Sequence, residues 1–99
     1  MLVIAVRLQD EGGKPESAAD VWLSVPVPTG DTSYNLLCYI DPYGDTVFNR
    51  LQMDVFLLEW ERLRAMARTP EQLEAWSGVR DLARKCNDDV HLYLRFIGD

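Results

Sequence analysis

Two carboxylates, a phenol and a carboxamide lie within residues 40–49 of the sequence, on Asp41, Asp45, Tyr43 and Asn49. Two carboxylates at this spacing are the kind of ligand that a loop offers to a hard cation. A calcium loop would also need further ligands and a closing bidentate glutamate, and this stretch has neither. Asp and Asn favour turns and helix caps, and a proline and a glycine here force a turn. We therefore expect a capped turn with no metal bound. Its exposed polar side chains make this corner the first candidate for binding a partner.

The single histidine, His91, is the second candidate, because its ordinary pKa suits a general base. Catalysis would also need an oriented carboxylate or a nucleophile beside it. No Ser-His-Asp or Cys-His arrangement and no phosphate-binding glycine loop follows from the spacing. One His and two scattered Cys also provide too few ligands for structural zinc. We expect a protein that is not an enzyme and has no cofactor, with a small enzyme using His91 and a carboxylate as an alternative.

Aromatic and arginine side chains are the third candidate, since both are enriched at binding hot spots. Trp22, Tyr39, Tyr93 and Arg95 are expected on the uncovered face of a sheet. Bases could stack on such a face, but little positive charge accompanies these aromatics. A protein partner or a second copy of the chain fits better. The alternative is that these aromatics pack beneath the loops 10–20 and 26–33.

The chain is acidic, with 16 Asp and Glu against 10 Lys and Arg and a net charge of −6. This charge argues against non-specific nucleic-acid binding, which requires basic patches. It fits either solubility alone or a basic protein partner, such as a nuclease domain, attracted by electrostatic steering. Asp88 and Asp89 follow the end of a predicted helix, where negative charge is locally unfavourable. The carboxylates expected at the surface are Asp10, Glu11, Asp20, Asp31, Asp41, Asp45, Asp54, Glu59, Asp88 and Asp89.

The elements that must position these side chains form one domain, residues 1–99, because this length and an apolar fraction of 47% suit a single core. Alternating and continuous apolar patterns predict strands and helices. The predicted strands are residues 2–9, 21–25, 34–41 and 90–97, and the predicted helices are 46–68 and 70–87. The expected fold is α+β: a four-stranded, mainly antiparallel sheet in the chain order βββααβ, with both helices on one face.

Capping signals define the two predicted helices. Asp45 and Thr46 are expected to cap the first helix. Thr69 and Gln72 form a capping-box pattern at the start of the second, with a proline at its first position. Gly78 lies inside the second helix at a cost of about 1 kcal/mol, which indicates close packing against a neighbour.

The apolar start of the chain, residues 1–6, is short and lacks a basic lead, so we expect a first strand and not a signal peptide. No apolar run approaches the ~20 residues that span a bilayer. Cys38 and Cys86 lack any paired motif and are expected to be free thiols in a cytoplasmic protein.

Two stretches, residues 40–52 (IDPYGDTVFNRLQ) and residues 91–99 (HLYLRFIGD), resemble a family of small uncharacterised bacterial proteins that has no assigned catalytic residues. In size, acidity and expected fold the chain also resembles immunity proteins of contact-dependent inhibition and other polymorphic toxin systems. That resemblance implies an antitoxin-like protein that neutralises a basic toxin domain by tight non-covalent binding. The alternative is a homodimeric structural or regulatory module with no toxin partner.

Overall fold

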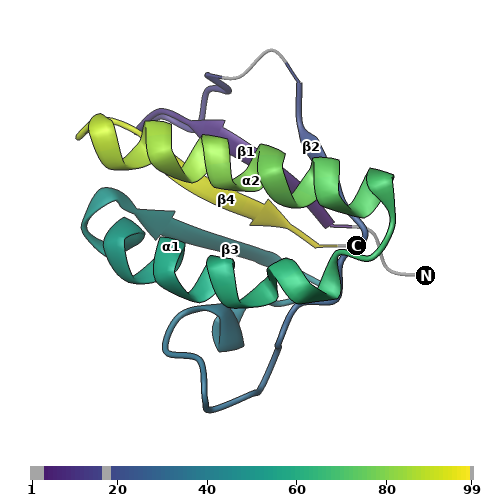
Figure 1. Ribbon diagram of the computed structural model, residues 1–99. Helices are drawn as coiled ribbons and strands as arrows, with labels where there is room; N and C mark the ends of the chain where they lie inside the picture. Colours follow the sequence, from purple (N-terminus) through teal and green to yellow (C-terminus); the bar gives the residue numbers. More distant parts are fainter. Residues whose placement is uncertain (1–3, 17–18, 99) are drawn as a thin grey trace.

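The computed structural model describes residues 4–16 and 19–98. Four strands, β1 (Ile4–Gln9), β2 (Val21–Leu23), β3 (Asp45–Asn49) and β4 (Tyr93–Ile97), form an antiparallel sheet in the order β2-β1-β4-β3. Two helices, α1 (Met53–Arg62) and α2 (Pro70–Asp88), pack on the same face of this sheet, as Figure 1 shows. The α+β fold and the order βββααβ are confirmed. None of the described helices is long and apolar enough to cross a membrane.

The core lies between the sheet and the helices. Alternation along the strands points every second side chain toward the helices. A cluster of four aromatic rings fills the α1 side of the core, with Phe56 stacked on Trp60 at 5.6 Å between ring centroids. Trp60 and Trp76 join the helices, because each indole N–H donates to the other residue's backbone carbonyl, at 3.0 and 2.9 Å. The largest buried side chains are Trp60, Trp76, Phe56, Phe96, Leu23, Leu37, Ile40 and Met53.

The predicted third strand, residues 34–41, is wrong. The segment is a loop containing a short 3₁₀ helix, η1 (Leu37–Tyr39). A 3₁₀ turn brings side chains three residues apart onto one side, so Leu37 and Ile40 are both fully buried while Tyr39 is exposed. The strand is predicted because the segment is a continuous apolar run, and such a run does not by itself distinguish a buried strand from a short helical turn.

The predicted helix 46–68 is also wrong in its first turns. Residues 45–49 form β3, which pairs with β4 across its whole length, as suits β-branched and aromatic residues. The helical segment begins with the 3₁₀ turn η2 (Arg50–Gln52), capped by Asn49. Asn49 and Gln52 form a capping box, the same pattern that Thr69 and Gln72 form at α2. After α1 the chain tightens into η3 (Leu63–Met66).

The sequence also predicts a broad apolar stripe that faces the core along this first helix, and the burial pattern of α1 differs from it. The residues of that stripe are Phe48, Leu51, Val55, Phe56, Leu58, Trp60, Leu63 and Ala67. Phe56, Trp60 and Leu63 face the core as expected, but Glu59 is buried too, with only 5% of its surface exposed. Leu51, Val55 and Leu58, which we expected inside, are exposed, Leu58 by 73%. The helix is therefore rotated relative to the prediction, because Met53 and Glu59 occupy positions that the pattern gave to Val55 and Leu58.

The second helix is confirmed. Thr69 accepts the backbone N–H of Gln72, whose side chain accepts the N–H of Thr69, and Pro70 is the first helical residue. Gly78 does pack closely: a Cβ there would lie 3.1 Å from Val21 Cγ2 on β2. The last strand is shorter than expected, because β4 begins at Tyr93 and His91 lies in the preceding turn.

Candidate functional site

The corner at residues 40–44 is a turn stabilised by its own carboxylate. Asp41 Oδ1 accepts the N–H of Tyr43 at 2.9 Å, and the N–H of Asp41 donates to Thr46 Oγ1 at 3.0 Å. Tyr43 is 72% exposed. Among residues 4–16 and 19–98, no group of three or more His, Cys, Asp or Glu side chains could hold a metal ion. Asp41 therefore shapes a turn, as Asp commonly does.

Gly98 closes this corner from the other end of the chain. Its N–H donates to the carbonyl of Gly44 at 2.8 Å. A Cβ on Gly98 would lie 2.5 Å from both the N and the O of Gly44, which no real structure tolerates without backbone movement. The two glycines thus allow the turn and the C-terminal segment to touch backbone to backbone.

Asp45 and Asn49, predicted to share the corner, leave it in different directions. Asp45 pairs with Arg95 on the uncovered face of the sheet, and Asn49 caps η2 at the far end of β3. The expectation that Asp45 and Thr46 cap a helix is wrong, because both belong to a strand. The four predicted corner residues are spread along a turn and a five-residue strand.

Glu59 is the buried carboxylate that holds the loop before β3. Its two oxygens accept the backbone N–H groups of Asn35, Leu36 and Leu37 at 2.7 to 3.1 Å. Burial by itself raises the pKa of Glu59, but these three donors and the nearby Arg62 lower it more, so the net pKa lies below its usual value. We expected Glu59 at the surface, and this expectation is wrong: its carboxylate is buried and accepts the hydrogen bonds that fix the loop.

The uncovered sheet face carries Trp22, Tyr93 and Arg95, as predicted from alternation. Arg7 and Arg95 lie directly opposite each other on β1 and β4, an unfavourable pairing of like charges. Each has its own carboxylate: Asp20 accepts two bonds from Arg7 at 2.8 and 2.9 Å, and Asp45 pairs with Arg95. The hydrogen bond from Arg7 lowers the pKa of Asp20. Tyr39, expected here, lies instead in η1.

The remaining predicted residues lie at the far end of α2. His91 Nδ1 is 2.9 Å from Glu11 Oε1, and this hydrogen bond raises the pKa of the exposed imidazole. Asp89 Oδ1 accepts the backbone N–H of His91 at 2.9 Å. Asp88 and Asp89 border a surface hollow of about 370 Å³ together with Glu16 and Lys85. Asp88 and Asp89 therefore share this hollow with Lys85, and Asp89 also stabilises the turn that contains His91.

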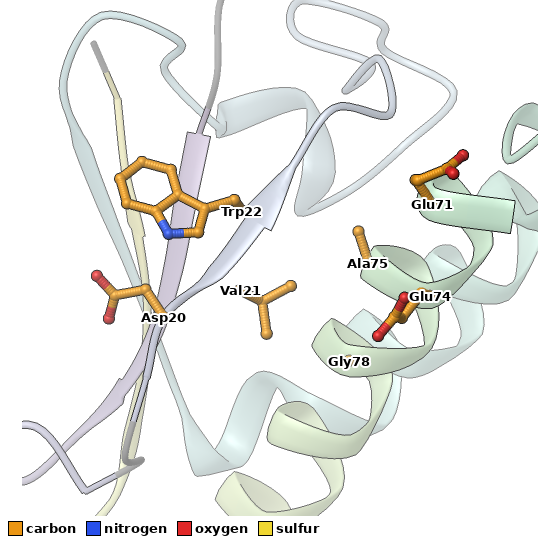
Figure 2. Close-up of a pocket in the computed structure, with 7 residues that line it drawn as sticks. All are labelled: Asp20, Val21, Trp22, Glu71, Glu74, Ala75 and Gly78. Atoms are coloured by element: carbon orange, nitrogen blue, oxygen red, sulfur yellow. The ribbon is translucent and has the colours of Figure 1, made fainter. Parts of the chain in front are cut away.

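A different acidic site lies between the edge strand β2 and the first half of α2. A groove of about 370 Å³ opens there, and Figure 2 shows the residues that line it. Val21 projects from β2 toward the helix, where small residues face it. Trp22, on the other side of the strand, is 64% exposed. The lining residues are Asp20, Val21, Trp22, Glu71, Glu74, Ala75 and Gly78.

Three of these lining residues are acidic, and two of them have no cation nearby. In the described part of the chain, no Lys, Arg or His nitrogen lies within 4.0 Å of the Glu71 or Glu74 carboxylate. Glu71 and Glu74 are three residues apart and so share one face of α2. Ala75 and Gly78 have side chains too small to fill the space between α2 and β2, so the groove stays open there. The groove therefore combines a short apolar floor with unneutralised negative charge.

The sequence alone does not predict this groove. The spacing of Glu71, Glu74 and Gly78 placed them on related faces of α2, but nothing in the sequence indicated which strand lies beside that helix. The close approach expected at Gly78 was the one relevant signal. Comparison of the chain with protein-family models, with curated proteins and with solved structures gave no match.

Proposed function

We propose that this chain is a non-enzymatic binding protein that holds a basic protein partner in the groove between β2 and α2. Immunity proteins that neutralise a basic toxin domain are the kind of protein we have in mind. The observation that carries the proposal is the pair of carboxylates, Glu71 and Glu74, that border a groove without a cation of their own chain within 4.0 Å in the described residues.

Charge supports a basic partner over a neutral one. Several carboxylates outside the groove are already engaged: Asp41 and Asp31 stabilise turns, Asp45 pairs with Arg95, and Glu59 is buried. Glu71 and Glu74 are available to lysine or arginine from outside. With a net charge of −6, the whole chain would also attract a basic protein over a distance and speed up association at low salt.

The geometry around His91 supports a role in binding over one in catalysis. The His91 and Glu11 side chains are 71% and 61% exposed, so water surrounds the pair. A general base works best where its substrate is held and water is excluded. A shift of the His91 titration on adding a small ligand would favour the enzyme alternative.

The test is purification of the tagged chain from a lysate of its own host, with stepwise elution by salt and identification by mass spectrometry. We expect a stoichiometric basic protein that is released as salt rises. The Glu71→Gln/Glu74→Gln variant should lose that protein. The matched control is Glu16→Gln/Glu61→Gln, which removes the same charge from exposed positions outside the groove that, among the described residues, also have no cation within 4.0 Å. Equal loss in both variants, or no loss in either, would contradict the proposed site.

Self-association is the second candidate, and one observation favours it. Leu51, Val55 and Leu58 expose an apolar stripe along η2 and α1, with Leu51 77% exposed. Such a stripe is a common dimer contact. Light scattering distinguishes the two candidates: a stable dimer that resists salt and dissociates in Leu58→Glu favours the module, and a monomer that binds a basic protein favours the first proposal.

A further inference from the structure

One edge of β2 has backbone N–H and C=O groups that bond to none of the other described strands. The register of β2 with β1 identifies the residue that carries these groups. In an antiparallel strand, alternate residues direct both N–H and C=O to the same neighbour. The carbonyl of Leu8 accepts the N–H of Glu16 on the side of β1 away from β4, so Leu8, Val6 and Ile4 all direct their backbone groups to that side. Val21 and Leu23, which pair with Val6 and Ile4, must therefore bond to β1.

Trp22 lies between these two bonded residues, so its N–H and C=O point away from the sheet. Among residues 4–16 and 19–98, no backbone group outside the sheet bonds to Trp22. The other edge strand is different: Thr46 Oγ1 on β3 accepts the N–H of Asp41 at 3.0 Å, so the chain's own loop lies beside that edge. The open edge at Trp22 borders the acidic groove.

We propose that the partner contributes an extended segment that adds to the sheet as a fifth strand beside β2, hydrogen-bonded to Trp22. This proposal rests on the proposed function and specifies how the basic partner is held. Main-chain hydrogen bonds along an exposed edge provide affinity in such complexes, and alternate side chains provide specificity.

The groove determines which side chains the added segment needs. A residue bonded to Trp22 places its side chain on the uncovered face, where the exposed indole offers apolar contact. Its two neighbours point toward α2. There the stem of a lysine or arginine lies over Val21, Ala75 and Gly78 while its charge reaches Glu71 or Glu74. The segment is therefore basic at alternate positions and apolar between them.

The probe is the capped heptapeptide Lys-Val-Lys-Val-Lys-Val-Lys, added at millimolar concentration to the ¹⁵N-labelled full chain. We expect amide shifts in β2 and in the first half of α2. The Trp22 amide should become protected from hydrogen exchange, while those of Val21 and Leu23 are already protected by β1. No shift at millimolar peptide, or shifts confined to other surfaces, would overturn the proposal.

Two N-methylated peptides separate strand addition from simple charge attraction. Methylation of the valine amides removes the donors that face β2, so affinity should fall by about tenfold or more. The lysine amides face away from β2, so methylating them should leave the affinity within about threefold of that of the parent peptide. If both peptides bind alike and the Glu71→Gln/Glu74→Gln variant weakens both, strand addition is wrong and the proposed function stands.

Two substitutions at one residue give the matching test on the protein. Trp22→Ala and Trp22→Pro both remove the indole, but only proline removes the outward N–H, which an edge strand does not need for its own pairing. We expect the Pro variant to bind the peptide at least about fivefold more weakly than the Ala variant. Equal affinity of two folded variants, verified by their amide spectra, would overturn strand addition. Loss of the lysate partner's dependence on Glu71 and Glu74 would instead overturn the proposed function.

Discussion

The corner at residues 40–44, with the strand and loop beside it, and the groove between β2 and α2 both contain several polar or acidic side chains, but their chemistry is opposite. In the corner, Asp41 accepts a backbone N–H; beside it, Asp45 on β3 pairs with Arg95, and Glu59 accepts three amides of the loop before β3. In the groove, Glu71 and Glu74 border an open surface. A carboxylate that already accepts hydrogen bonds from its own chain stabilises the fold. A carboxylate without such partners remains available for binding.

The largest expected difference between the two regions is at Glu59. Replacing Glu59 with Ala leaves three amides without their acceptor, and we expect a loss of about 3 kcal/mol in the free energy of unfolding. Glu59→Gln keeps one acceptor oxygen and should cost about 1 kcal/mol. Urea denaturation measures both. Glu61→Ala, exposed and two residues away, is the control and should stay within about 0.5 kcal/mol. If Glu59→Ala left the free energy of unfolding unchanged, the carboxylate of Glu59 would not stabilise the fold, and the contrast with Glu71 and Glu74 would disappear.

Backbone packing at the corner predicts the next effect. Gly98→Ala places a methyl group 2.5 Å from the backbone of Gly44, so we expect a loss of about 2 kcal/mol in stability. Gly12→Ala is the matched control, because its Cβ would meet only Asp10 Oδ1, at an ordinary 3.5 Å. Thermal melts of the two variants should differ clearly. Equal melting temperatures would mean that the corner adjusts to the added methyl group.

Acid should weaken the stabilising contribution of Glu59. The folded-state pKa of Glu59 is lowered from its ordinary 4.5, so its stabilising contribution is present above that pH and is lost as the pH falls through the folded-state pKa. Urea midpoints measured from pH 7 downward should fall more steeply for the natural chain than for Glu59→Gln. The difference in urea midpoint between the natural chain and Glu59→Gln should therefore become smaller as the pH falls. A gap independent of pH would show that the charge of Glu59 contributes nothing.

The smallest effects compare one carboxylate from each region directly. Asp41→Ala removes the acceptor that forms the turn and should cost about 1 kcal/mol of stability. Glu74→Ala should change stability by no more than about 0.5 kcal/mol and reduce binding of a basic partner instead. Urea denaturation and a binding titration on the same two variants make the comparison. If Asp41→Ala weakens binding as much as Glu74→Ala does, the corner belongs to the interface as well.

Local sequence signals predicted α2 and missed the start of α1, although the chain uses the same device at both. The capping box of Thr69 and Gln72 is recognisable in the sequence because a proline follows Thr69. Asn49 and Gln52 form the same box, but it directly follows apolar residues that suit either a strand or a helix. Only pairing with β4 made residues 45–49 a strand. Short apolar stretches do not by themselves distinguish these states.

The sequence by itself determined the α+β class, the order of elements, the capped start of α2 and the close packing at Gly78, because these follow from local spacing and backbone chemistry. Only the tertiary structure decided that Glu59 is buried, that residues 37–40 form a 3₁₀ turn, and that β2 is an edge strand beside Glu71 and Glu74. Those outcomes depend on which segments meet in space. A carboxylate's role depends on the donors around it, and distant parts of the chain supply many of them.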